Sequence, residues 1–241
     1  MSVSSPNGVT VVLVHGAWAD ASSWQRVIPH LLAKGVPVVG VQNPTTSLAD
    51  DVAATRRALA RIDGPIVLVG HSWGGAVITE AGADPKVKAL VFVSAFAPDV
   101  GETLGALVGK YDAPPALAHI EDDGAGFLTL GVEGWISDVA QDLPEVEART
   151  LAAIQTPLAA STFGDSFSVA AWATRPNWYI VSGQDRVVSI ALEREFAARM
   201  KAKTTELAAG HLALLSMPDA VAEVIIDAVQ EVASAQQPAA A

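Results

Sequence analysis

Cysteine is absent from this chain of 241 residues. Without thiols, the chain has no disulfide bond, no thiolate ligand for a metal and no cysteine nucleophile. Basic residues are also scarce: 15 lysines and arginines stand against 26 aspartates and glutamates, which gives a net charge of −11. Nucleic acids and anionic membrane surfaces attract positively charged proteins, so we expect neither of them as a partner.

Long apolar segments are missing as well. No stretch approaches the roughly 20 apolar residues that a membrane span needs. Residues 1–8 have neither the basic region nor the apolar core of a secretory signal. We therefore expect a cytoplasmic protein, present as a monomer or a homodimer. Its length fits one domain, or one domain with an inserted subdomain.

Apolar segments that predict strands alternate with segments that predict helices. Stretches that are apolar on both faces favour central parallel strands. Residues 9–14 have this pattern, and further strands are predicted at residues 37–41, 66–69, 87–96, 178–181 and 204–207. A helix is predicted to begin near Ser22 and to contain Pro29, and Ser47 is predicted to cap the next helix. The alternation predicts a doubly wound α/β fold with a six-stranded, mostly parallel sheet.

Residues 98–172 interrupt this alternation. Glycine, proline and acidic residues separate short amphipathic pieces there, and no strong strand pattern is present. We predict that residues 98–172 form a small helical cap, inserted after the fourth strand. The core would then consist of residues 1–97 and 173–241.

One turn places a serine in a setting typical of nucleophilic catalysis. The segment Gly-His-Ser-Trp-Gly at residues 70–74 lies between the third strand and a helix-compatible stretch. Ser72 must adopt strained backbone angles at such a turn, and Gly70 and Gly74 remove Cβ atoms that would clash. The helix N-terminus behind the serine favours developing negative charge. The structural alternative is a helix-capping serine.

A candidate acid and a candidate base follow later strands. Sites in open parallel sheets form at the carboxyl ends of the strands, where Asp185 follows the fifth strand and His211 the sixth. A serine hydroxyl needs a base within reach, and that base needs a carboxylate that fixes its tautomer. Ser72, Asp185 and His211 are therefore the candidate catalytic residues. Asp99, which follows the fourth strand, is the competing acid.

An acyl-transfer site also needs N–H donors for the oxyanion. We expect these from Trp73, directly after the serine, and from Ala17, in the loop after the first strand. Aromatic residues near the serine and in the cap predict an apolar substrate pocket. Its candidate residues are Gly16, Trp18, Phe96, Trp135 and Phe163. The sequence contains no metal-binding cluster and no phosphate loop, so we expect no metal and no cofactor.

Two motifs and the chain order Ser, Asp, His resemble the α/β-hydrolase superfamily over nearly the whole chain. The motifs are Leu-Val-His-Gly-Ala-Trp at residues 13–18 and Gly-His-Ser-Trp-Gly-Gly at residues 70–75. They resemble the branch of plant methylesterases, hydroxynitrile lyases and bacterial esterase relatives. The resemblance implies a serine triad, a small helical cap and ester hydrolysis. Lyases of this branch carry threonine or asparagine at the position of Gly16. The best-known lyases also carry lysine at the position of Leu212. Both differences between this chain and the lyases favour an esterase.

These observations predict a serine carboxylic ester hydrolase that acts on small hydrophobic or aromatic esters through an acyl-enzyme. Two other classes of function are open at this point. One is a hydroxynitrile lyase-like enzyme or a carbon–carbon bond hydrolase with the same triad. The other is a non-catalytic ligand receptor on the hydrolase fold, which would bind its ligand without turnover.

Overall fold

The computed structural model describes residues 8–236. Its main sheet has six strands in the order β2-β1-β3-β4-β8-β9, and each neighbouring pair is parallel. The strands are β1 (Thr10–Val14), β2 (Val38–Val41), β3 (Ile66–His71), β4 (Val87–Val93), β8 (Asn177–Ser182) and β9 (Lys203–Leu207). The predicted α/β fold is therefore confirmed. Residues 1–7, on which the prediction about a secretory signal depends, lie outside the described residues.

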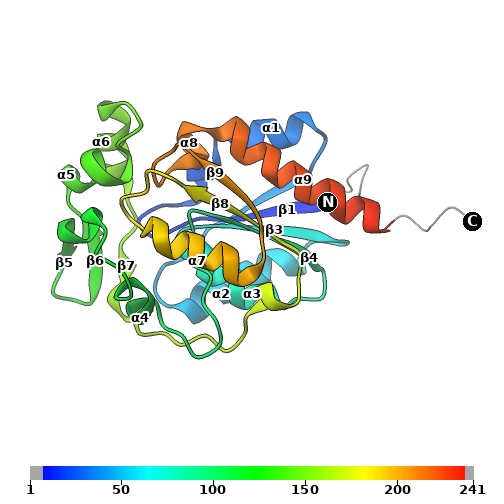
Figure 1. Ribbon diagram of the computed structural model, residues 1–241, viewed down its shortest axis with the longest axis horizontal. Coiled ribbons are helices and arrows are strands. Elements are labelled where there is room, and N and C mark those ends of the chain that lie inside the picture. Colours follow the sequence, from blue (N-terminus) through cyan, green and yellow to red (C-terminus); the bar gives the residue numbers. More distant parts are fainter. Residues whose placement is uncertain (1–7, 237–241) are drawn as a thin grey trace, which may run out of the picture.

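Helices cover both faces of this sheet. Figure 1 shows α1 and α9 on one side of the sheet, with α2, α3 and α7 on the other. Their bounds are α1 (Ile28–Ala33), α2 (Leu48–Ala60), α3 (Trp73–Ala81), α7 (Ile190–Met200), α8 (Ala213–Ser216) and α9 (Pro218–Gln236). The predicted cap of α2 is confirmed, because the Ser47 side chain accepts a hydrogen bond from Asp50 N at 3.1 Å.

The serine turn lies between buried elements at the centre of the sheet. Every residue of β1 and β3 is buried, as expected for strands covered by helices on both faces. All nine residues of α3, which begins directly after Ser72, are buried as well. Most of its side chains are apolar, as expected for a helix in the interior of a protein. The serine therefore lies on a strand–turn–helix unit that is packed on all sides.

The predicted helix from Ser22 is not continuous. The chain instead forms a 3-10 turn, η1 (Ala21–Trp24), and then α1. The Asp20 side chain caps η1 by accepting a hydrogen bond from Ser22 N at 2.6 Å. Pro29 lies in the first turn of α1, where its missing N–H leaves no helical hydrogen bond unmade. Proline thus marks the beginning of a helix here and does not kink one.

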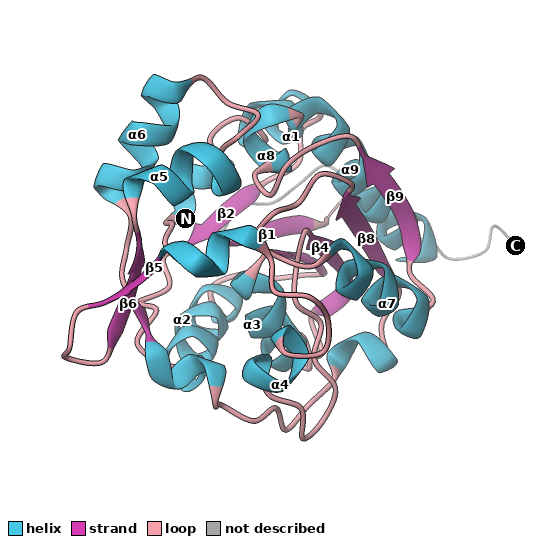
Figure 2. Ribbon diagram, turned by 60° about the vertical axis from the view of Figure 1, so that its left-hand side comes forward, coloured by secondary structure: helices cyan, strands magenta, loops and turns pink. Residues whose placement is uncertain are grey.

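Residues 98–172, called the cap segment below, connect β4 to β8. They contain α4 (Leu104–Val108), α5 (Val132–Gly134) and α6 (Glu145–Ile154), the 3-10 turns η2 (Pro115–His119), η4 (Ala160–Phe163) and η5 (Ala171–Ala173), and a π-helical turn, η3 (Trp135–Val139). They also contain an antiparallel sheet of β5 (Ile120–Asp122), β6 (Phe127–Leu130) and β7 (Leu158–Ala159). Figure 2 shows β5 and β6 beside α5 and α6, away from the main sheet.

The sequence analysis did not predict this second sheet. Its strands have two to four residues, which is too short for an alternating pattern to be recognised. The division of the chain into a core and a cap at residues 98 and 172 stays a prediction. Within residues 8–236, no helix combines the length and the apolar character that a membrane crossing requires.

Candidate functional site

The backbone of Ser72 has the strain expected of a strand-to-helix turn. Its φ is 53° and its ψ is −121°, a region that residues with a Cβ rarely adopt. Such a conformation costs about 1–3 kcal/mol and persists only where the surroundings enforce it. Here Ser72 N donates to Val93 O at 3.2 Å, and Phe96 N donates to Ser72 O at 3.2 Å. The end of β4 therefore holds the turn in its strained form.

The flanking glycines are required by close backbone contacts. A Cβ on Gly70 would lie 2.5 Å from Gly74 O, and a Cβ on Gly74 would lie 2.4 Å from Val14 O. Both distances are too short for any side chain, and the opposing atoms belong to the backbone. The steric reason that the sequence suggested for these glycines is therefore confirmed.

Asp185 and His211 meet at the carboxyl end of the sheet. His211 Nδ1 lies 2.7 Å from Asp185 Oδ2, and the two side chains are almost fully buried. The other oxygen, Asp185 Oδ1, accepts hydrogen bonds from Val187 N at 2.7 Å and Val188 N at 2.9 Å. An acceptor-only carboxylate at Nδ1 requires the proton on that nitrogen, which leaves Nε2 as the basic atom.

His71 connects this pair to the serine turn. Its Nε2 lies 3.0 Å from the carbonyl oxygen of His211 and donates to it, and the two rings lie 4.7 Å apart between centroids. Among residues 8–236, neither the Ser72 hydroxyl nor His211 Nε2 makes a hydrogen bond. Hydrogen bonds between a nucleophile and its base are often long before substrate binds.

Two histidines beside the site stay neutral at physiological pH. Burial lowers the pKa of His71 well below its ordinary value, and the charge of His211 lowers it further. Burial also lowers the pKa of His15, whose Nε2 accepts a hydrogen bond from Asn43 N at 2.9 Å. Both rings therefore act as fixed hydrogen-bonding groups in the loops around Ser72.

A second buried carboxyl group lies next to Asp185. Glu193, on α7, is fully buried, and its Oε2 accepts a hydrogen bond from Ser182 N at 3.1 Å. Burial raises the pKa of Glu193 well above its ordinary value, and the negative charge of Asp185 raises it further. Both effects favour the protonated, neutral form of the Glu193 side chain. Sequence reasoning missed this residue, because an acidic residue in a helix is usually exposed.

The two expected oxyanion donors lie at this end of the sheet. Within residues 8–236, the backbone N–H groups of Ala17 and Trp73 donate to no backbone carbonyl. The Trp73 indole is held in place, since its Nε1 donates to Asp51 Oδ2 at 2.6 Å. Asp51 Oδ1 accepts from Thr45 N at 2.8 Å, so Asp51 connects the Thr45 loop to the residue after the serine. Nothing in the sequence pattern of α2 pointed to Asp51.

A small apolar cavity of about 30 Å³ lies over Ser72. Five cap-segment side chains close it: Leu104, Val108, Leu117, Leu158 and Phe163. Core residues that line it include Ala17, Trp18, Trp73, Phe96 and Val187. Three of the predicted pocket residues, Trp18, Phe96 and Phe163, are therefore at the cavity.

The other two predicted pocket residues lie elsewhere. Trp135 lines a separate cavity with Leu151 and Leu215, because η3 places its ring against α6 and α8. Gly16 does not line the cavity wall, but a Cβ on Gly16 would lie 2.8 Å from the Ser72 Cβ. Its role is thus to let the loop after β1 pass close to the serine. The assignment of Trp135 to the pocket needs correction.

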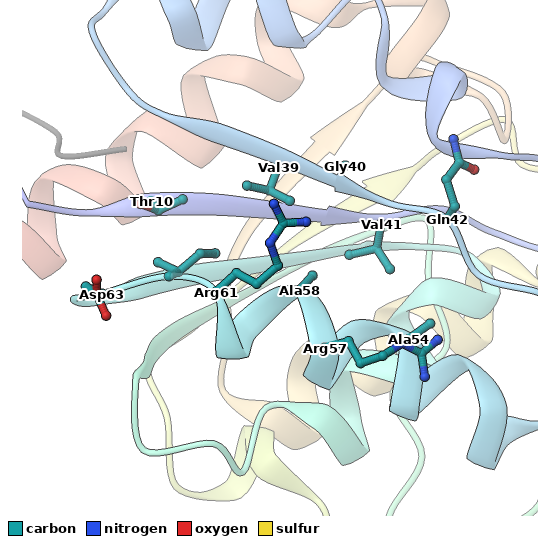
Figure 3. Close-up of a pocket in the computed structure, with 11 residues that line it drawn as sticks. Thr10, Val39, Gly40, Val41, Gln42, Ala54, Arg57, Ala58, Arg61 and Asp63 are labelled. Carbon is teal, nitrogen blue, oxygen red and sulfur yellow. The ribbon is translucent and has the colours of Figure 1, made fainter. Parts of the chain in front are cut away.

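A larger groove of about 790 Å³ runs along the edge strand β2, away from Ser72. Val39, Gly40 and Val41 of β2 line one side; Arg57 of α2 and Arg61, directly after α2, line the other (Figure 3). The groove is open and contains none of the candidate catalytic residues. The cavity over Ser72 is therefore the better candidate for the catalytic site, although it is smaller than the groove.

Comparison with known proteins agrees with this geometry. Residues 11–224 match the sequence model of a family described as "Alpha/beta hydrolase family". "Probable hydrolase R7" of Phoma sp. is 27% identical, with 90% of this chain and 96% of that protein aligned. "Methylesterase 8" of Arabidopsis thaliana is 27% identical over 76% of this chain and 75% of its own.

A solved structure is similar over almost the entire chain. The pyrethroid hydrolase from Sphingobium faniae superimposes with a TM-score of 0.79 and 25% identity. The match covers 94% of this chain and 99% of that one. The resemblance to plant methylesterases and bacterial relatives is thereby confirmed, and the chain belongs to the alpha/beta hydrolase family.

Proposed function

We propose that the protein is a serine carboxylic ester hydrolase with Ser72 as nucleophile, His211 as general base and acid, and Asp185 as the carboxylate that orients His211. The observation that carries the proposal is the 2.7 Å contact between His211 Nδ1 and Asp185 Oδ2, beside a serine held in a strained turn. A helix-capping serine would not need that conformation, and its side chain caps nothing here.

The proposed reaction has two halves. Ser72 Oγ attacks the ester carbonyl carbon while its proton passes to His211 Nε2, and the N–H groups of Ala17 and Trp73 stabilise the oxyanion. The carbon–oxygen bond to the alcohol then breaks, and the alcohol leaves with the proton from His211. Water attacks the acyl-enzyme by the same route, which releases the acid and restores Ser72.

The lining of the cavity supports a small hydrophobic or aromatic substrate. Apart from Ser72, the side chains over the site are alanine, valine, leucine, phenylalanine and tryptophan. The cavity of about 30 Å³ is comparable with the volume of roughly one water molecule, so an ester must displace cap-segment side chains to enter. Relatives named as a methylesterase and a pyrethroid hydrolase also support hydrolysis of small molecules.

Replacement of the nucleophile tests the proposal. Ser72→Ala is expected to lower the kcat for p-nitrophenyl acetate about a million-fold, because the acyl-enzyme cannot form. Ser161→Ala, at an exposed serine of the cap segment, serves as the matched control and is expected to retain full activity. A fluorophosphonate probe, followed by mass mapping, should label Ser72 in the parent protein and leave the Ser72→Ala protein unlabelled.

The same assays separate the other functions. An ester panel of varied acyl length, with mandelonitrile as a further substrate, distinguishes an esterase from a lyase by its products. If Ser72→Ala kept most of the esterase activity, the proposal would be wrong. Ligand binding without turnover of any ester in the panel would instead indicate a receptor.

A further inference from the structure

One turn of the cap segment contacts both loops that carry the proposed acid and base. This turn, residues 138–142, includes the last two residues of η3 (Trp135–Val139) and the three residues after it. Its side chains reach Gln184 and Arg186, the neighbours of Asp185, and Gly210, the neighbour of His211. None of these contacts lies in the cavity over Ser72, and the mechanism proposed above does not use them.

Gln141 bridges the two loops. Its Nε2 donates to Gln184 O at 2.9 Å, directly before Asp185. The same amide packs against Gly210, since a Cβ added at Gly210 would lie 2.5 Å from Gln141 Nε2. The amide plane therefore fills the space that a side chain before His211 would occupy.

Asp142 also contacts Gly210, the residue before His211. Its Oδ2 accepts a hydrogen bond from Gly210 N at 2.8 Å. This fixes the Ala209–Gly210 peptide, one residue before His211. The acid and histidine loops are already joined by Gln184 N, which donates to Ala209 O at 3.0 Å. Gln141 and Asp142 add a second connection between the loops, supplied entirely by the cap segment.

The turn itself is anchored to the acid loop. Arg186 Nε donates to Asp138 Oδ1 at 2.6 Å, and the Asp138 side chain is only 2% exposed. Arg186 O also accepts from Ala116 N at 3.0 Å. The residue after Asp185 thus contacts two parts of the cap segment. Residues on both sides of Asp185 are held from the cap.

We propose that Gln141 and Asp142 are positioning residues, which act through Gln184 and Gly210 to set the place of His211 relative to Asp185 and Ser72. This proposal rests on the esterase function proposed above. It gives the cap segment a second role: the part that covers Ser72 admits substrate, while the turn at 138–142 keeps the acid and base aligned. Two hydrogen bonds and one close contact, all outside the pocket, carry this role.

Kinetics of matched variants test the proposal. Gln141→Ala and Asp142→Ala are each expected to lower kcat about tenfold or more, since a small displacement of the base slows proton transfer, with KM within twofold of the parent value. Asp142→Asn should retain most of the activity, because its side-chain oxygen still accepts from Gly210 N. The control is Asp165→Ala, which removes a cap-to-core hydrogen bond of 2.9 Å to Leu48 N, far from both loops in the chain.

A spectroscopic readout separates this proposal from the esterase function. The proton between His211 Nδ1 and Asp185 gives a downfield NMR resonance that does not depend on turnover. It should shift or broaden in Gln141→Ala and Asp142→Ala and stay unchanged in Asp165→Ala. An unchanged resonance and a kcat within twofold of the parent in both variants would overturn the positioning role. So would an equal loss in Asp165→Ala. Activity of Ser72→Ala would refute the esterase function while leaving this resonance interpretable.

Discussion

Replacement of Asp185 by asparagine changes one atom of the proposed triad. Two backbone donors, Val187 N at 2.7 Å and Val188 N at 2.9 Å, hold Asp185 Oδ1. In Asp185→Asn, those donors keep the amide oxygen in the place of Oδ1. The amide nitrogen then takes the place of Oδ2, 2.7 Å from His211 Nδ1.

That exchange reverses the hydrogen bond to the base. An amide NH₂ donates, so His211 Nδ1 must accept and the ring proton moves to Nε2. A protonated Nε2 cannot take the proton of Ser72. The wrong tautomer lowers kcat by about 10⁴ in serine hydrolases, which corresponds to about 5.5 kcal/mol of activation free energy. Because both backbone hydrogen bonds are kept, the fold should survive the change.

Initial rates with p-nitrophenyl acetate and a thermal melt measure both effects. The control is Asp99→Asn, at the competing acid, whose Oδ1 accepts from the adjacent Val100 N. We expect a loss of about 10⁴ in kcat for Asp185→Asn and activity within twofold of the parent for Asp99→Asn. A folded Asp185→Asn protein within tenfold of the parent rate would refute the tautomer argument. A large loss in Asp99→Asn alone would identify Asp99 as the acid.

Two further predictions concern the surroundings of the serine turn. Burial raises the pKa of Asp51 to about 6 from an ordinary value of 3.8, so the folded protein binds this proton more tightly than the unfolded chain. The contribution of Asp51 to stability therefore falls by roughly 3 kcal/mol as the pH rises from about 4 to 6. Chemical denaturation should show that the parent, relative to Asp51→Asn, is more stable at pH 4.5 than at pH 7.5. The same relative free energy of unfolding at both pH values would contradict this. In Gly16→Ala the new Cβ would lie 2.8 Å from the Ser72 Cβ, so kcat/KM should fall about 100-fold. The control is Gly109→Ala, whose new Cβ has its nearest atom at 3.4 Å and which should keep the parent activity. Similar activity of the two variants would refute the steric argument.

Packing between distant parts of the chain explains where sequence reasoning was incomplete. The strands β5, β6 and β7 pair only with one another and are too short to show a periodic pattern. Trp135 was expected in the pocket because it is aromatic and lies in the cap segment, yet the direction of its ring depends on η3. Leu104 and Leu158 line the cavity instead, and as ordinary leucines they carry no signal of such a role in the sequence.

What the sequence determined by itself is the part of the site that depends on local geometry. A serine between Gly70 and Gly74, after an apolar strand and before a helix, can fold in few ways, because the clash that a Cβ on Gly70 would make is with Gly74 O, inside the turn itself. The chain order of Ser72, Asp185 and His211 follows from the alternation of strands and helices. Only the tertiary structure brought Glu193 to Asp185, Asp51 to Trp73, and Gln141 to Gly210. These contacts join segments that are distant along the chain or lie on separate elements, and only the packing of the whole fold decides which side chains meet there.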